Sequence, residues 1–271
     1  EIDSGLGNDT VTGGMGVDTF TDAGGDDTLR ETRNIDLALF GNYYLAGELP
    51  GGNYDSWSAA TEVEIIPQQN GRAIFEHAIL TGGDADNRIV VNDDDNSVTV
   101  AGMPTLTVTP WNQQAILDNK NNAASAAPES YIVFTTNGAG ANIVIKDTGG
   151  TTGLDFLEIY GRATADFVRL EVLNPFAASE DARVVIGAVN PDIVHYDAQI
   201  EQLIVDTREG DDTVRLDDNR ANTEINLGSG KDTVSIGTVV TKLDSRGVPV
   251  VDLSMTTPGV TAPTQVFGGT G

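Results

Sequence analysis

The 271-residue sequence contains no cysteine and few basic residues, and each scarcity excludes a class of protein. Without cysteine there is no disulfide, no thiolate metal site and no cysteine nucleophile. Only 15 lysines and arginines stand against 41 aspartates and glutamates, which gives a formal net charge of −26. Nucleic acid is therefore not expected as a partner, because its binding requires a basic surface. No apolar run reaches the roughly 18 residues of a membrane-spanning helix, so no membrane insertion is expected.

The acidic excess itself indicates a counter-ion. Self-repulsion at this charge opposes a compact state unless something cationic neutralises it, and a divalent metal is the natural candidate. Acidity could instead serve only to keep a secreted or halophilic protein soluble. That alternative would not require the carboxylates to be ordered along the sequence, and here many of them are.

Glycine and aspartate recur with a period of nine near the N-terminus. Residues 4–12, 13–21 and 22–30 form three contiguous nonapeptides, each with glycine fourth, aspartate sixth, threonine seventh and a large apolar residue eighth. Glycine permits a tight turn with positive φ. Aspartate supplies the hard anionic oxygen that calcium prefers. The pattern therefore predicts calcium-binding turns between short strands.

This spacing resembles the RTX calcium-binding repeat, G-G-x-G-x-D-x-U-x with U apolar. The resemblance implies a parallel β-roll with two nonapeptides per turn and the apolar eighth residue packed inside. It also implies that Asp9 and Asp27 share an ion, whereas Asp18 belongs to the opposite row. The metal-site residues expected at this end are Gly5, Gly7, Asp9, Gly14, Gly16, Asp18, Gly25 and Asp27.

The same spacing returns in residues 207–215 and 227–235, although residues 216–226 separate the two copies. The metal-site residues expected here are Gly210, Asp212, Gly228, Gly230 and Asp232. Simple β-turns would explain these aspartates as well. Residues 268–271 and 1–3 match the beginning and the end of one nonapeptide, which suggests one period of a tandem array cut from a longer protein. Cuts at two unrelated loops explain the ends equally well.

Between the two ends, short apolar runs separated by Gly, Asp, Asn and Pro predict strands. Residues 111–127 are the one candidate for a short helix or an Asn/Ala-rich loop. The expected fold is all-β: an RTX-like calcium-binding β-roll over 1–40, an irregular β-rich centre over 41–205, and degenerate RTX-like repeats over 206–271. Worn nonapeptides at 82–90, 91–99 and 161–169 favour a parallel β-solenoid throughout. The alternative for the centre is an inserted β-sandwich.

No catalytic grouping is recognisable. His77 and His195 lie far apart and outside any zinc-protease motif. Four aromatic residues could stack on sugars or cap the apolar core: Tyr43, Tyr44, Tyr54 and Trp57.

We therefore expect no enzyme but a calcium-stabilised structural or adhesive module of a giant secreted bacterial protein: a filament, surface layer or adhesin at the cell surface. Its expected cofactor is Ca²⁺, and its expected partners are neighbouring copies or repeats of the same protein, or surface polysaccharide. The alternative is the β-helix part of a secreted polysaccharide-modifying enzyme. The 15 scattered basic residues favour the structural class.

Overall fold

The structure is a computed structural model. It describes the chain outside residues 50–53, 55, 84–86, 93–95, 119–128, 136–139, 149–153, 174–181, 238–240, 244–248, 252–259, 261 and 269–271, and gives the strands at 241–243 and 249–251 as backbone only. In the described part the regular elements are all strands, as predicted. No helix there is long and apolar enough to cross a membrane.

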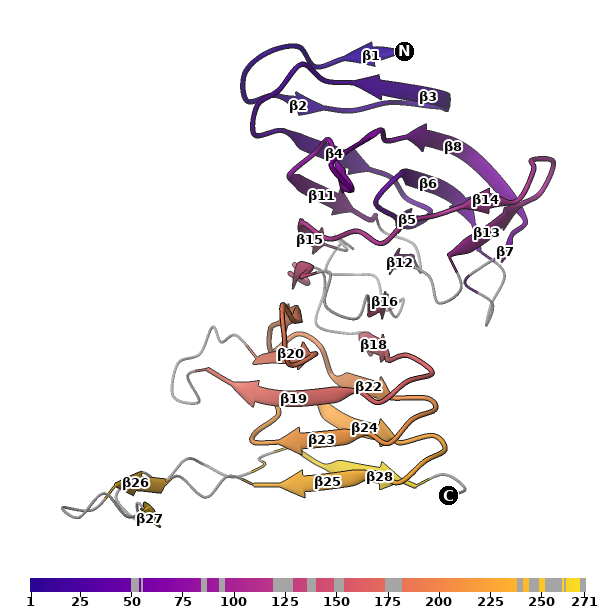
Figure 1. The fold of residues 1–271 in the computed structure, drawn as a ribbon. Helices are drawn as coiled ribbons and strands as arrows, with labels where there is room; N and C mark the ends of the chain where they lie inside the picture. Colours follow the sequence, from indigo (N-terminus) through magenta and orange to yellow (C-terminus); the bar gives the residue numbers. More distant parts are fainter. Residues whose placement is uncertain are drawn as a thin grey trace.

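Most strands belong to two large sheets. The first sheet contains, in spatial order, β1 (Ile2–Asp3), β3 (Gly16–Thr21), β8 (Ala59–Ile65), β6 (Tyr43–Glu48), β5 (Asp36–Leu39), β12 (Arg88–Val91), β16 (Ser130–Phe134), β18 (Phe156–Tyr160), β22 (Gln202–Asp206), β24 (Asn222–Asn226) and β28 (Thr264–Phe267). The second contains β2 (Thr10–Val11), β4 (Thr28–Thr32), β11 (His77–Thr81), β15 (Gln114–Asp118), β17 (Asn142–Ile145), β21 (Asp192–Tyr196), β20 (Ala182–Ile186), β19 (Phe167–Val172), β23 (Thr213–Leu216) and β25 (Thr233–Ile236). Strands of both sheets follow one another from the N-terminal to the C-terminal end of the molecule (Figure 1).

Pairing within the two sheets is mostly parallel. We call two consecutive strands, one from each sheet, a rung; β1 with β2 and β3 with β4 are the first two rungs, and β22 with β23 and β24 with β25 are the last two complete ones. Each sheet also holds one strand that runs against its neighbours, β6 in the first and β20 in the second. The central strands β11, β15 and β17 pair in parallel, unlike the antiparallel sheets of the alternative β-sandwich.

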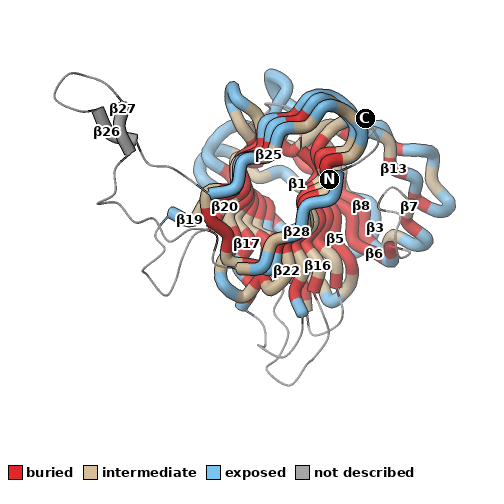
Figure 2. Tube along the Cα trace, turned by 90° about the horizontal axis from the view of Figure 1, so that it is seen from below, coloured by how far each residue is buried: buried red, intermediate tan, exposed pale blue. Residues whose placement is uncertain are grey.

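The main core lies between the two sheets, where every second side chain of a strand points inward. The apolar eighth residues of the first three nonapeptides, Val11, Phe20 and Leu29, are all buried there, as predicted. Viewed along the stack, the buried residues line the interior of superposed rungs (Figure 2). The repeat pattern therefore identified the inward face correctly at this end.

A second apolar cluster covers the outer face of the first sheet. It is closed by a small sheet of β7 (Ser56–Trp57), β13 (Ser97–Val100) and β14 (Leu106–Thr107). Trp57 is 1% exposed in this cluster and Tyr44 is 0% exposed in the main core. Neither ring can stack on a sugar without unfolding, so that interpretation is wrong for these two residues.

The other described strands are two short hairpins, β9 (Gln68–Gln69) with β10 (Arg72–Ala73) and β26 (Thr241–Leu243) with β27 (Pro249–Val251). In the candidate helix at 111–127, residues 114–118 form the parallel strand β15, and residues 119–127 lie outside the described part. Parts of the worn nonapeptides at 82–90 and 91–99 and of the terminal match at 268–271 lie outside it too.

Candidate metal centres

Asp9 and Asp27, expected to share an ion, are stacked in successive rungs. The backbone N–H of Asp9 donates to Asp27 Oδ1 at 2.7 Å, 18 residues along the chain. Thr28 N–H in turn donates to the carbonyl oxygen of Asp9 at 2.9 Å. The Oδ2 atoms of both aspartates are buried and have no hydrogen-bond partner. Each carboxylate therefore retains one oxygen that a cation could use.

The C-terminal pair repeats this arrangement. Asp212 N–H donates to Asp232 Oδ1 at 3.1 Å, 20 residues along the chain. Thr233 N–H donates to the Asp212 carbonyl oxygen at 2.8 Å. Asp212 Oδ2 is buried without a hydrogen-bond partner, as at the other end. The structure thus brings together the two C-terminal aspartates despite the 11 intervening residues that made their repeat less regular, residues 216–226.

Each row of stacked aspartates continues into a third rung. At the N-terminal end this third rung lies outside the nonapeptide pattern. Asp27 N–H donates to Glu76 Oε2 at 2.9 Å. Asp166 N–H donates to Asp212 Oδ1 at 2.7 Å. Asp166 is the sixth residue of a worn nonapeptide, whereas Glu76 follows an insertion and belongs to no repeat. The sequence therefore signalled the extension to Asp166 but not the extension to Glu76.

Glycine is required in these turns for two reasons. Seven of the eight glycines expected at the sites have φ in the left-handed region: Gly5, Gly7, Gly14, Gly16, Gly210, Gly228 and Gly230. At Gly25 the reason is space, because a Cβ there would lie 1.8 Å from the carbonyl oxygen of Gly7. A Cβ at Gly230 would lie 1.7 Å from the carbonyl oxygen of Gly210. The two ends therefore share the same close approach between fourth-position glycines.

Asp18 lies away from the other aspartates, on β3 of the first sheet. Its partner in register on β8 is Glu64, and Gly16 is in register with Glu62. Asp18 is thus on the opposite side of the rung from Asp9 and Asp27, as the resemblance implied. A glutamate, and not an aspartate from a neighbouring repeat, is its partner on β8.

The electrostatics of the N-terminal row disfavour bare carboxylates. Burial is the largest cause raising the pKa of Asp27 above its ordinary value, and the carboxylates of Asp22 and Asp9 raise it further. The hydrogen bond from the Asp9 N–H lowers this pKa and offsets part of the increase. A divalent cation beside Asp27 would stabilise the anionic form that burial penalises.

Two buried acidic clusters among the described residues were not predicted. In each, one oxygen per residue lies within 4.8 Å of the others: Glu31 with Glu62 and Glu64, and Glu129 with Asp147 and Asp155. The available signal for the first was the alternation Glu62-Val63-Glu64 on a strand, which places two acids on one face. Abundant acidic residues elsewhere hid that signal.

The two histidines both lie in the second sheet, His77 in β11 and His195 in β21. His77 Nε2 is 2.9 Å from Asp26 Oδ1 beside the N-terminal row.

Comparison with known proteins gives no matching family model, no matching curated protein and no matching solved structure. The likeness to RTX repeats therefore rests on the residues of the turns themselves.

Proposed function

We propose that this chain is a calcium-stabilised segment of a parallel β-roll or β-solenoid, and that it serves as a structural or adhesive module of a large extracellular bacterial protein. One observation carries the proposal. At both ends, aspartates from successive rungs are stacked, and Asp9, Asp27 and Asp212 each keep one buried carboxylate oxygen without a hydrogen bond.

The residues that would hold calcium are Asp9 and Asp27 at one end and Asp212 and Asp232 at the other. Calcium accepts carboxylate and backbone carbonyl oxygens in flexible arrangements, which suits turns rich in aspartate and glycine. When bound, the ion supplies positive charge between stacked acids that would otherwise repel one another. It would thereby tie each rung to the next at the turn.

Ion binding would be coupled to folding. Where free calcium is low, stacked aspartates repel and the turns lose their link. In a medium with millimolar calcium, even sites with dissociation constants of roughly 10⁻⁴ to 10⁻³ M fill. Folding after secretion, at the bacterial cell surface, follows from this coupling.

The paired arginines support a structural role. Arg33 Nε lies 2.6 Å from Glu62 Oε2, and Arg88 lies 2.8 Å from Asp36. Arg183 pairs with Glu171 on the adjacent strand. The pairs of Arg88 and Arg183 lie within one sheet, whereas Arg33, directly after β4 of the second sheet, pairs with Glu62 on β8 of the first. A polysaccharide-cleaving face would instead present such cations beside a substrate groove. We therefore favour the structural module over the enzymatic alternative.

The two ends of the stack suit contact with neighbouring copies or repeats. Leu6, Met15 and Val17 are exposed in the first rungs, and Ile236 and Phe267 are exposed in the last strands. β1 and β2 are edge strands at one end, and β25 and β28 are edge strands at the other. Open edges and exposed apolar side chains favour end-to-end stacking.

Circular dichroism tests the calcium dependence. We expect the full chain to gain β-signal and a higher Tm when chelator is replaced by millimolar calcium, with sodium chloride at matched ionic strength as the control for screening. Free calcium at ten times the dissociation constant of a site adds about 1.4 kcal/mol per site to the free energy of unfolding. Identical spectra and Tm with chelator and with calcium would reject the proposal.

A further inference from the structure

Three glutamates interrupt the apolar interior near the N-terminal end. Glu31 points inward from β4, where the strands that follow in the second sheet place Leu80 and Leu117 in register. Glu62 and Glu64 flank Val63 on β8 and point inward as well, with side chains at most 1% exposed. Burying these three acids, one of them at a position that the following rungs fill with leucine, is costly unless their charge is compensated.

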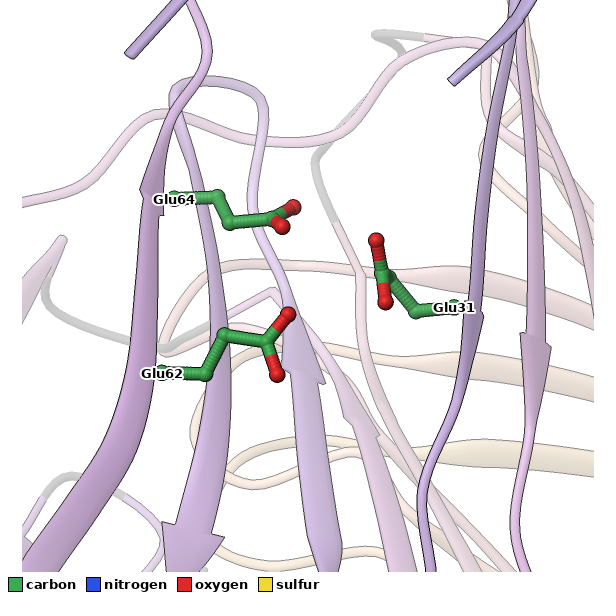
Figure 3. A group of neighbouring side chains, drawn as sticks. All are labelled: Glu31, Glu62 and Glu64. Carbon is green, nitrogen blue, oxygen red and sulfur yellow. The ribbon is translucent and has the colours of Figure 1, made fainter. Parts of the chain in front are cut away.

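The three carboxylates face one another across the space between the sheets (Figure 3). One oxygen from each lies within 4.8 Å of the others. Calcium–oxygen distances of 2.3–2.6 Å allow oxygens on opposite sides of one ion to be about 5 Å apart. The spacing therefore matches the coordination shell of a single calcium-sized ion.

The negative charges of Glu31 and Glu62 are partly compensated by groups of the protein itself. Arg33 reaches Glu62 at 2.6 Å and Glu31 at 3.2 Å. The backbone N–H groups of Gly13 and Gly14 donate to Glu31 Oε1 at 2.8 Å and to Glu62 Oε1 at 3.3 Å. These contacts hold two of the three carboxylates in place.

Glu64 has no such compensation. It is 0% exposed, and neither of its carboxylate oxygens has a hydrogen-bond partner. The hydroxyl of Tyr44, the partner of Glu64 in register on β6, is also buried without a hydrogen bond. Two unsatisfied oxygen-bearing groups thus adjoin one acidic cluster, a combination that fits a bound cation.

The charges give the valence of that ligand. Three ionised carboxylates and one guanidinium leave a net charge of −2, which one divalent cation neutralises. Protons are the competitor, because burial and the neighbouring glutamates raise the pKa of Glu64 to about 10 and that of Glu31 to about 7. Arg33, Tyr44 and Asp18 are the other titratable or charged groups next to the cluster.

We propose that Glu31, Glu62 and Glu64 form an interior binding site for one calcium-type divalent cation, separate from the aspartate turns. The backbone of Gly13 and Gly14 covers the site. A Cβ at residue 13 would lie 1.5 Å from Glu64 Oε1, so a side chain there would displace the carboxylate. The site stands on its own residues and does not depend on the proposed function.

Equilibrium dialysis of the full chain with calcium tests the site. We expect Glu64→Gln to bind one calcium ion fewer than the parent protein at pH 7.5. Glu48→Gln is the matched control, since Glu48 is exposed on the neighbouring strand β6, and it should bind as many ions as the parent. At pH 5.5 the affinity of the interior site should fall at least about tenfold, because metal binding must release protons. Equal stoichiometry in the parent and Glu64→Gln overturns the inference.

A second measurement covers the case in which Glu64→Gln does not fold. Crystals of the parent protein in which terbium(III) replaces calcium should show an anomalous peak among the three glutamates. Peaks at the aspartate turns without one at the glutamates would overturn this inference and leave the proposed function intact. A peak at the glutamates alone would support the interior site and reject calcium in the turns.

Discussion

The first and last rungs of the stack have the same turns but different interiors. Both ends stack their aspartates through an N–H to carboxylate bond, Asp9 to Asp27 and Asp212 to Asp232. Two residues after the apolar eighth position, however, the N-terminal repeat has Glu31 and the C-terminal repeat has Leu216. Both side chains are 0% exposed. The turn chemistry is therefore independent of what the rung encloses.

This difference separates two sources of stability. The C-terminal rungs bury leucine and valine and gain apolar burial whether or not an ion is present. The N-terminal rungs bury three carboxylates and one partial counter-charge from Arg33. Calcium should therefore stabilise the N-terminal rungs more strongly than the C-terminal ones.

The largest effect is expected when a buried acid is introduced into the apolar C-terminal interior. Leu216→Glu would place a carboxylate at the C-terminal counterpart of Glu31 without an arginine such as Arg33 to compensate its charge. Burying an uncompensated charge should lower the free energy of unfolding by about 3–5 kcal/mol, measured by urea denaturation in calcium. Leu216→Met is the control and should cost less than about 1.5 kcal/mol. A cost below about 1 kcal/mol for the glutamate would show that the C-terminal interior tolerates charge as well.

The next effect tests the shared turn. Gly25→Ala and Gly230→Ala each place a Cβ against a carbonyl oxygen of the preceding rung. We expect each to cost about 1–3 kcal/mol in chemical denaturation, with Gly230→Ala the larger because its φ is also +151°. Gly268→Ala, with nothing within 4 Å of its Cβ, should be neutral. A large effect at one end only would refute the equivalence of the turns.

The interior difference also predicts a pH dependence in chelator. The pKa of Glu31 is raised from 4.5 to about 7 in the folded protein, so the folded state binds more protons than the unfolded one in that window. The contribution of Glu31 to stability is therefore full below about pH 4.5 and is lost as the pH rises through about 7. The free energy of unfolding should fall by up to about 1.4 kcal/mol per pH unit for one proton.

The difference in the free energy of unfolding between the parent and Glu31→Gln isolates the contribution of Glu31, since the other carboxylates titrate in both proteins. Thermal melts in chelator at pH 5, 6 and 7 would measure it. Parallel stability curves for the two proteins would contradict the raised pKa. In calcium the parent should lose less stability as the pH rises, because the ion replaces the proton.

The smallest effect is expected when the charge of one turn aspartate is removed at either end. Asp27→Asn and Asp232→Asn retain an Oδ1 acceptor for the N–H of the preceding aspartate but lose the charge. We expect calcium affinity to fall about tenfold, or about 1.4 kcal/mol, for the buried Asp27 and less for the half-buried Asp232. Calcium titrations of Tm measure both shifts. A greater loss at Asp232 would reverse the proposed ranking of the ends.

Local periodicity predicted much of the fold. A period of nine with an apolar eighth residue identified short strands and their inward side chains, Val11, Phe20 and Leu29, because that information lies within a few residues. The stacking of Asp9 on Asp27 followed from the resemblance and agrees with the 18-residue register. The antiparallel strands β6 and β20 left no such signal, since strand direction depends on how an inserted loop returns to the sheet.

The candidate sites were predictable only where the repeat is intact. Glu76 joins the N-terminal row 49 residues after Asp27, across an insertion whose length no local pattern reveals. The cluster of Glu31 with Glu62 and Glu64 also requires the pairing of strands from two sheets. Groups of residues brought together by long-range packing were therefore missed, whereas groups made by a single turn and its repeat were predicted.

Hydrogen exchange tests the central claim that calcium links successive rungs at the aspartate turns. The amides of Asp9 and Asp212 both donate to a stacked carboxylate, so each reports on one end of the molecule. We predict that calcium slows exchange of both amides relative to chelator, with the larger slowing at Asp9. Equal exchange rates with and without calcium at both positions would contradict the account.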